Sequence, residues 1–157
     1  DGGVRVPALA ERPGKIEAGL VVNTPCSTLD YFPMVANLTD YQMPDDRPID
    51  GQDLMPILMG HTTNREKAIP FRSRGNATIV KDQHKLVLPK GELYNLSDDW
   101  SEKNNIASAH PDRVKLMTAE LMKYLDSMQK SHAGEDYNDL SFKPLDEWNS
   151  LRMKRNK

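Results

Sequence analysis

Two arginines separated by one residue are the most promising binding residues in the sequence. Arg72 and Arg74 belong to the stretch FRSRGN, and on extended backbone residues two apart lie on the same side of the chain. The forked donors of a guanidinium group match two oxygens of a sulfate or a carboxylate at once. The pattern therefore predicts an oxyanion-binding pair. The alternative is a solvated loop whose arginines form surface ion pairs.

The single cysteine and the four histidines are the other residues that could carry chemistry. Cys26 lies in TPCSTLD and could be a nucleophile or a packed residue, since one cysteine cannot form an internal disulfide. His84 follows a predicted hairpin turn, where a lone histidine is more often structural or exposed than catalytic. No histidine has a second ligand at metal-ligand spacing, and the aspartates of residues 45–53 lack the pattern of a calcium loop.

Length and composition set the class of protein. The chain has 157 residues, 38% hydrophobic and 28% charged, which is typical of a soluble globular domain with a core. Its net charge of −2 gives no electrostatic reason to bind nucleic acid, and no apolar run reaches the roughly 20 residues of a membrane span. The opening residues, DGGVRVP, resemble the interior of a protein, so we expect a fragment.

The first 66 residues are predicted to hold short elements. VRVPALAE is typical of a short strand at a sheet edge or end. Ser27 and Asp30 have the spacing of a capping box, which predicts a helix that continues to about Leu38. A second short helix is predicted over residues 53–59, followed by Gly60 in the left-handed conformation.

Residues 67–130 are predicted to form a small α+β subdomain. The stretch ATIVKDQHKLVL (77–88) indicates a hairpin, and ELYNL (92–96) indicates a third strand. Residues 110–130 predict an amphipathic helix with Pro111 at its first position and an apolar stripe of Val114, Met117, Leu121, Leu125 and Met128. Residues 131–157 are interpreted as a polar tail. The expected fold class is therefore α+β.

Five ordered stretches resemble the C-terminal part of formylglycine-dependent sulfatases of the alkaline phosphatase superfamily, including arylsulfatases and N-acetylgalactosamine-6-sulfatases. They are DGGVRVPALAERPGKIEAG, STLDYFPMVANL, RPIDGQDLMPILMG, the hairpin ending HKLVL, and ELYNLSDDWSEKNNIA with HPDRVKLMTAELMKYL. The resemblance implies that residues 1–66 end a large α/β catalytic domain. Residues 67–130 would then form a subdomain with a four-stranded antiparallel sheet beside a long helix.

The resemblance also implies which catalytic groups to expect in the parent enzyme. Sulfatases use a formylglycine made from the first residue of C-x-P-S-R, together with calcium bound by Asp and Asn oxygens, to stabilise developing charge on sulfate oxygens. Cys26 is followed by S-T-L-D and does not fit that motif. We therefore expect neither a catalytic residue nor a metal ligand in this chain, and we expect Cys26 to pack just before a helix.

Substrate contacts are implied for three residues. By resemblance, the loop with Arg72 and Arg74 and the hairpin with His84 approach a sulfated carbohydrate. Arg5 is expected to orient the preceding turn without contacting substrate. The expected partners are this substrate and the remainder of the catalytic domain, in a periplasmic, extracellular or lysosomal enzyme.

Two alternatives stay open. One is a free-standing module that binds sulfated glycans through Arg72 and Arg74. The other is a fragment of a phosphodiesterase or phosphonate hydrolase of the same superfamily, because only upstream residues separate these enzymes from sulfatases.

Overall fold

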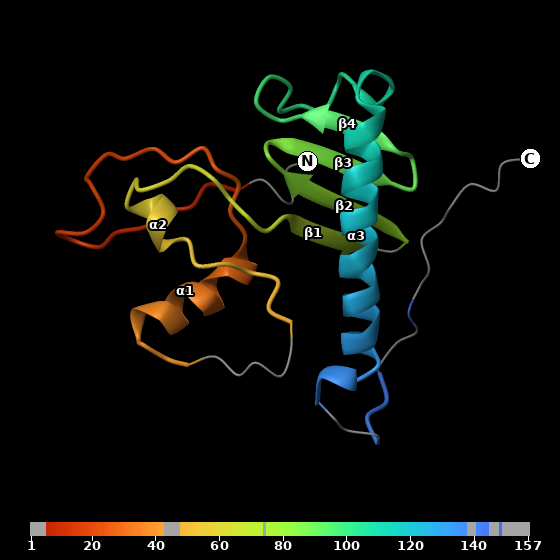
Figure 1. Ribbon diagram of the computed structural model, residues 1–157. Coiled ribbons are helices and arrows are strands. Elements are labelled where there is room, and N and C mark those ends of the chain that lie inside the picture. Colours follow the sequence, from red (N-terminus) through yellow and green to blue (C-terminus); the bar gives the residue numbers. More distant parts are fainter. Residues whose placement is uncertain (1–5, 43–47, 74, 138–140, 145–147, 149–157) are drawn as a thin grey trace, which may run out of the picture. The chain divides into compact units, whose positions relative to one another are not determined.

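The computed structural model describes residues 6–42, 48–73, 75–137, 141–144 and 148 (Figure 1). These residues form two compact units. The first lies within residues 6–42 and 49–67, and the second comprises residue 48 and the described residues from 68 onward. The predicted domain limits of 1–66, 67–130 and 131–157 stay a prediction.

The first unit is built around a short helical segment whose start was predicted from its capping residues. A 3₁₀ turn, Thr28–Asp30, leads directly into α1, Tyr31–Leu38. The Ser27 backbone N–H donates to Asp30 Oδ2 at 2.8 Å, and the Leu29 N–H donates to Ser27 Oγ at 3.3 Å. These bonds satisfy amide groups that a helix start leaves without helical partners, so the capping box is confirmed.

The second helix of this unit, α2 (Met55–Leu58), is shorter than predicted. Asp53 lies outside it, because the Asp53 carboxylate accepts the Met55 N–H at 2.9 Å and closes a turn before the helix begins. Gly60 follows the helix with φ at +73°, as predicted for a residue that ends a helix in the left-handed region.

The strand predicted at the beginning of the chain is not present in residues 6–11, the part of that stretch that the structure describes. Val6 and Leu9 are 73% and 103% exposed. A strand is stabilised by hydrogen bonds to a neighbouring strand and by burial of one face, and these described residues have neither. The prediction is therefore wrong for residues 6–11.

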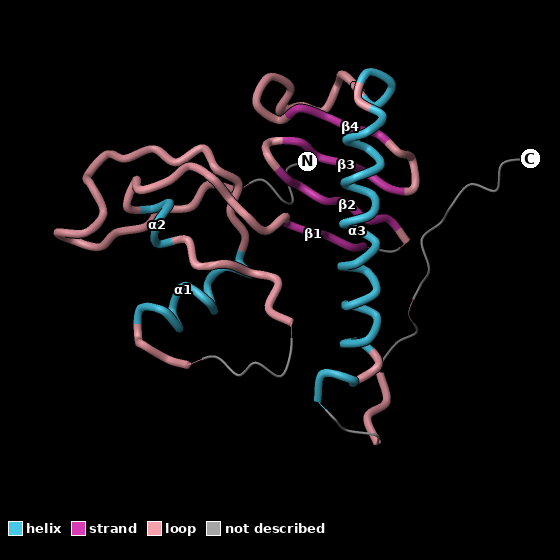
Figure 2. Tube along the Cα trace, in the orientation of Figure 1, coloured by secondary structure: helices cyan, strands magenta, loops and turns pink. Residues whose placement is uncertain are grey.

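The second unit contains one antiparallel sheet with strands in the order β1-β2-β3-β4 (Figure 2). The strands are Ile69–Ser73, Asn76–Lys81, His84–Leu88 and Glu92–Asn95. The hairpin turn between β2 and β3 has positive φ at both central residues, Asp82 (+46°) and Gln83 (+61°), which matches the right-handed twist of the flanking strands. The predicted hairpin and third strand are confirmed.

The strand β1 was missed by the residue pattern, which suggested a loop there. Pro70 lies within it, and a proline weakens any strand prediction because it donates no backbone hydrogen bond. β1 tolerates Pro70 because it is an edge strand, paired only with β2 in the described sheet. The four-stranded sheet implied by the resemblance is thus confirmed.

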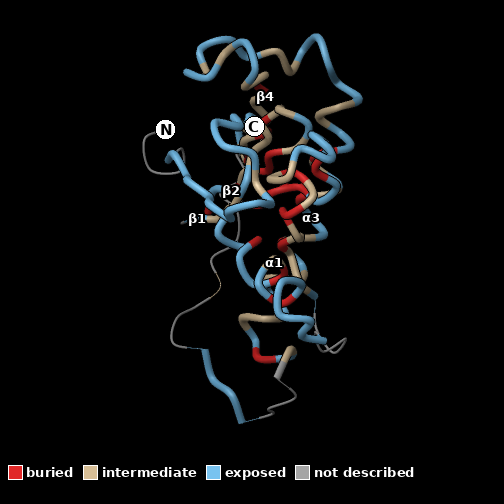
Figure 3. Tube along the Cα trace, turned by 90° about the vertical axis from the view of Figure 1, so that its left-hand side faces the viewer, coloured by how far each residue is buried: buried red, intermediate tan, exposed pale blue. Residues whose placement is uncertain are grey.

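A single long helix, α3 (Pro111–His132), covers one face of this sheet (Figure 1). The predicted apolar stripe faces the core: Met117, Leu121 and Leu125 are buried, and Val114 and Met128 pack at its margin. Buried residues concentrate between the sheet and this helix (Figure 3). The α+β class is confirmed. Among the described helices, none is long and apolar enough to cross a membrane.

Candidate functional site

Arg72 lies on the sheet face that packs against α3. It is paired with Ala77, which is itself paired with Leu88, and both are buried in the core beneath α3. Directly paired residues of antiparallel strands share a face. The guanidinium carbon of Arg72 lies 3.6 Å from the ring centroid of Trp148, so a residue of the chain itself occupies one face of this predicted substrate contact.

His84 begins β3 on the same face of the sheet, beside the turn. Its Nδ1 lies 2.7 Å from the Asp82 carbonyl oxygen and 3.4 Å from Arg113 Nη1. A carbonyl oxygen only accepts, so the short contact requires a proton on Nδ1 and leaves Nε2 as the second nitrogen for a ligand. Arg113, in the first turn of α3, adds a second donor group to this corner.

The structure does not bring these two residues together. Arg72 is paired with Ala77 near the start of β2, whereas His84 is paired with Lys81 at its end. Four residues of a strand span about 13 Å, and two strand spacings add about 10 Å across the sheet. Arg72 and His84 therefore lie far apart on one sheet face, two strands from each other and at opposite ends of β2. Arg5 and Arg74 lie outside the described residues.

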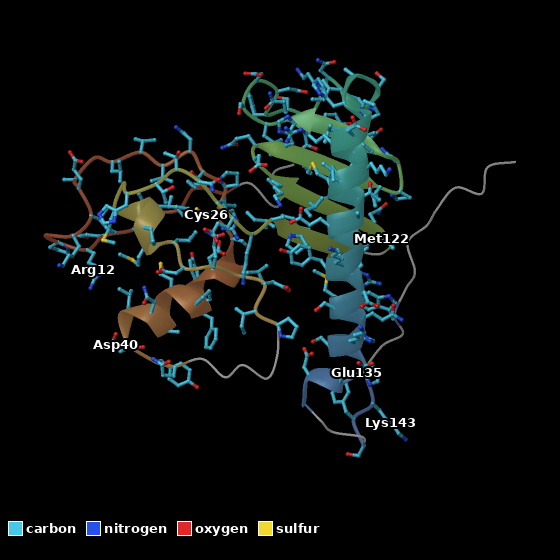
Figure 4. All side chains as sticks on the ribbon, viewed as in Figure 1. Arg12, Cys26, Asp40, Met122, Glu135 and Lys143 are labelled. Atoms are coloured by element: carbon cyan, nitrogen blue, oxygen red, sulfur yellow. The ribbon has the colours of Figure 1, made fainter. Side chains whose placement is uncertain are left out.

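Cys26 is exposed on the loop that leads into the first helical turn (Figure 4). Its thiol donates to the Thr24 carbonyl oxygen at 3.3 Å. Partial loss of hydration, followed by the nearby Asp30 carboxylate, raises the pKa of the thiol against an opposing effect of Arg65. The thiolate is the nucleophilic form, so this environment does not activate Cys26. The expectation that Cys26 packs is wrong, because its side chain is exposed.

The strongest polar cluster of the described chain is a buried ion pair in the first unit. Asp30 is 0% exposed and Arg65 is 9% exposed. Arg65 Nη1 and Nη2 donate to the two carboxylate oxygens of Asp30, each at 2.8 Å. The Ser27 and Gln52 backbone N–H groups donate to the same carboxylate at 2.8 and 2.9 Å. Asp30 thus joins the start of α1, the loop before α2 and the end of the unit.

Further contacts hold the loop before α2 in place. Lys67 Nζ donates to the carbonyl oxygens of Ile49 and Gly51, and the Lys67 N–H donates to Gln52 Oε1. A Cβ atom at Gly51 would overlap the carbonyl oxygen of Leu29, so only glycine fits there. Charged groups in this cluster are paired with one another or with backbone, which is the arrangement of a structural network.

The Asp30 environment predicts a loss of stability in acid. Burial alone raises the pKa of Asp30, but hydrogen bonds from Arg65, Gln52 and Ser27 outweigh it and lower the pKa below its ordinary value. The ion pair therefore stabilises the fold fully above the unfolded pKa, about 3.9, and this contribution is lost as pH falls through the lower folded pKa. We expect urea unfolding, followed by hydrogen exchange in residues 27–38, to show this decline below about pH 4. In Asp30→Asn the decline should be shallower; an unchanged slope would contradict the assignment.

The described residues do not fit the calcium and formylglycine that sulfatases use. No three His, Cys, Asp or Glu side chains among them gather as metal ligands. Asp53 instead accepts hydrogen bonds from the Met55 N–H and from Asn37 Nδ2, at 2.9 and 2.6 Å. Cys26 is followed by S-T-L-D and not by the residues of a formylglycine motif.

Three residues of these clusters were not predicted from the sequence. Arg113 had a usable signal, since a cation in the first turn of a helix opposes the helix dipole and suggests another role. Trp148 lies in the stretch interpreted as a polar tail, and nothing local connects it to Arg72. Arg65 is 35 positions from Asp30, and its pairing follows only from the folded chain.

Comparison with known proteins finds relatives among the sulfatases. No family model matches the chain. It is 48% identical to the steryl-sulfatase of Rattus norvegicus over 71 residues, covering 45% of this chain and 12% of that protein. It is 29% identical to the N-acetylgalactosamine-6-O-sulfatase of Bacteroides thetaiotaomicron over an alignment of 148 residues, covering 82% of this chain and 28% of that protein. The chain thus spans well under two thirds of the length of these relatives.

A solved structure supports the same relationship in three dimensions. The structure comes from work on glycosaminoglycan metabolism in Bacteroides thetaiotaomicron and superposes with a TM-score of 0.51 at 29% identity, covering 60% of this chain and 24% of the other. The chain therefore resembles the C-terminal part of formylglycine-dependent sulfatases in both its sequence and its fold.

Proposed function

We propose that this chain is part of a sulfuric ester hydrolase that releases sulfate from a sulfated carbohydrate. The observation that carries the proposal is the alignment with an N-acetylgalactosamine-6-O-sulfatase over 82% of the chain. The steryl-sulfatase match is higher in identity but covers 45% of the chain. A match that includes most of both units is the better guide to substrate class, so a sulfated sugar is preferred over a sulfated sterol.

In this proposal the nucleophile and the metal lie in other parts of the parent enzyme. The parent would carry a formylglycine and a calcium ion, which together would supply the attacking group and neutralise sulfate charge. The described residues do not fit either group, and this chain would contribute substrate-facing surface. Arg72, Arg74 and His84 are the proposed contacts to the sulfated sugar, and Arg5 is proposed to orient the turn before it.

The proposed partner of the first unit is the remainder of the catalytic domain. Several large apolar side chains of this unit are exposed, which is unfavourable unless another surface covers them. On and beside α1 they are Leu29, Tyr31, Phe32, Val35, Leu38 and Tyr41, each between 40% and 55% exposed. A buried ionic network beside an uncovered apolar helix is the arrangement expected of the margin of a larger core. By resemblance, the enzyme would be periplasmic, extracellular or lysosomal.

The experiment is an assay of the native polypeptide together with mass mapping of its peptides. We expect release of inorganic sulfate from N-acetylgalactosamine-6-sulfate, and a peptide whose C-x-P-S-R or S-x-P-S-R motif carries an aldehyde at its first residue. Steryl sulfate serves as the matched substrate from the other relative. Preference for the sterol would overturn the substrate class, and a native polypeptide without the aldehyde would overturn the sulfatase proposal. Salt-sensitive binding of sulfated glycans without any hydrolysis would favour a binding module instead.

The proposed contacts are tested in the same assay. We expect His84→Ala to raise KM for the sulfated sugar about ten- to a hundredfold with little change in kcat, because losing one charged hydrogen bond is worth about 1.5–3 kcal/mol. His110→Ala is the matched control, since that histidine is exposed before α3 and is not assigned to the substrate. Equal kinetics in the two variants would remove His84 from the substrate site.

A further inference from the structure

The second unit has an aromatic contact that the proposed function does not use. The guanidinium carbon of Arg72 lies 3.6 Å from the ring centroid of Trp148. The ring centroids of Trp148 and His132 are 5.5 Å apart, with the two planes tilted by 59°. Arg72 belongs to the edge strand β1, and His132 is the last residue of α3. One side chain late in the chain thus contacts both the edge of the sheet and the end of the helix.

A second aromatic residue contacts the chain just after α3. Gly134 is buried, with φ at +89°, and a Cβ atom built there would lie 2.6 Å from Phe142 Cδ1 and 2.9 Å from Phe142 Cγ. The phenyl ring therefore lies directly on the Gly134 backbone in space that any larger residue would fill. Phe142 and Trp148 contact neighbouring positions, Gly134 and His132, at the same end of α3.

The contact of Trp148 with Arg72 is made to an edge strand of the sheet. An edge strand presents one row of backbone groups without a strand partner, and natural proteins cover such edges with other parts of the chain. The interaction of a guanidinium with a tryptophan face is among the more favourable cation–π contacts. A tail without a role would not be expected to place both Phe142 and Trp148 against the end of α3.

We propose that Phe142 and Trp148 form a C-terminal clasp, in which Trp148 holds Arg72 of β1 and His132 at the end of α3, and Phe142 packs on Gly134. The clasp stabilises β1 through Arg72 and the last turn of α3 through His132 and Gly134. This inference does not depend on the enzyme having sulfatase activity.

The test is peptide-resolved hydrogen exchange of the full-length protein. In Trp148→Ala we expect the amides of β1 and of residues 125–134 to exchange roughly three- to tenfold faster, in the range of one lost cation–π contact. Amides of β3, which the clasp does not touch, should be unchanged. Trp148→Phe keeps a ring over Arg72 and should restore most of the protection.

Trp100→Ala is the matched control, since it removes the other tryptophan of the chain at a site that is 67% exposed. It should leave the exchange of β1 unchanged. In the double variant Arg72→Met with Trp148→Ala, β1 should exchange no faster than in either single variant, because both remove the same contact. Wild-type protection of β1 in Trp148→Ala, or independent effects of the two substitutions, would overturn the clasp.

Discussion

Replacing Asp30 by alanine should destabilise the first unit by about 3–5 kcal/mol, the cost of breaking a buried ion pair by removing one partner. The cause is the charge that remains: Arg65 is 9% exposed and would keep its guanidinium away from water without a carboxylate. The Ser27 and Gln52 N–H groups would also lose their acceptor. Urea titration with hydrogen exchange in residues 27–38 and 49–58 measures this loss separately from the second unit.

The control for this experiment is another aspartate in an ion pair. Asp126 pairs with Lys130 one turn later in α3 at 2.8 Å, with the two side chains 65% and 55% exposed. Asp126→Ala should change stability by about 0.5 kcal/mol or less, because water screens an exposed pair of this kind. A similarly small effect for Asp30→Ala would show that the buried pair is not what holds the first unit together.

In the second unit, the substitution with the largest expected effect on the free energy of unfolding is Leu121→Ala. This residue is 0% exposed in the middle of the stripe that packs on the sheet. Leu121→Ala removes buried methyl groups and leaves a cavity, so we expect a loss of about 2–5 kcal/mol in the free energy of unfolding. Urea unfolding followed by circular dichroism at the helix band reports on this change, since α3 is the longest described helix.

Leu116 provides the matched comparison on the same helix. It is 71% exposed, so Leu116→Ala should change the free energy of unfolding by about 0.5 kcal/mol or less. Both substitutions exchange the same residue types at interior positions of α3, and helix propensity therefore affects them alike. If the two variants unfolded at the same urea concentration, the sheet-facing stripe would not be the core of this unit.

Elements with strong local signals were predicted correctly from the sequence. The stripe of α3 repeats at helical spacing, and Pro111 fits the first position of a helix, so the element and its buried face follow from about twenty residues. The capping box needs only Ser27 and Asp30, and the β2–β3 hairpin needs only two β-rich runs around a two-residue turn. In each case the determining interactions lie within a few positions of one another.

The candidate site was less predictable, because its contacts join distant parts of the chain. Arg72 was predicted from the sequence as a binding residue, which stays a prediction, but its contact with Trp148 joins residues that are far apart in the chain. His84 was selected without Arg113, which reaches it only because α3 lies across the sheet. The resemblance implied that Arg72 and His84 both approach one sulfated carbohydrate, whereas the register of β1, β2 and β3 places the two residues far apart on the sheet.

The sequence by itself determined the α+β class, the helix α3 with its buried stripe, the hairpin and the resemblance to sulfatases. The tertiary structure alone decided that Asp30 pairs with Arg65, that β1 joins the sheet as an edge strand, and that Trp148 covers Arg72. The physical reason is the range of the interactions. Periodicity and capping act over a few residues, while burial of a charge or pairing of an edge strand depends on partners that only the folded chain brings within reach.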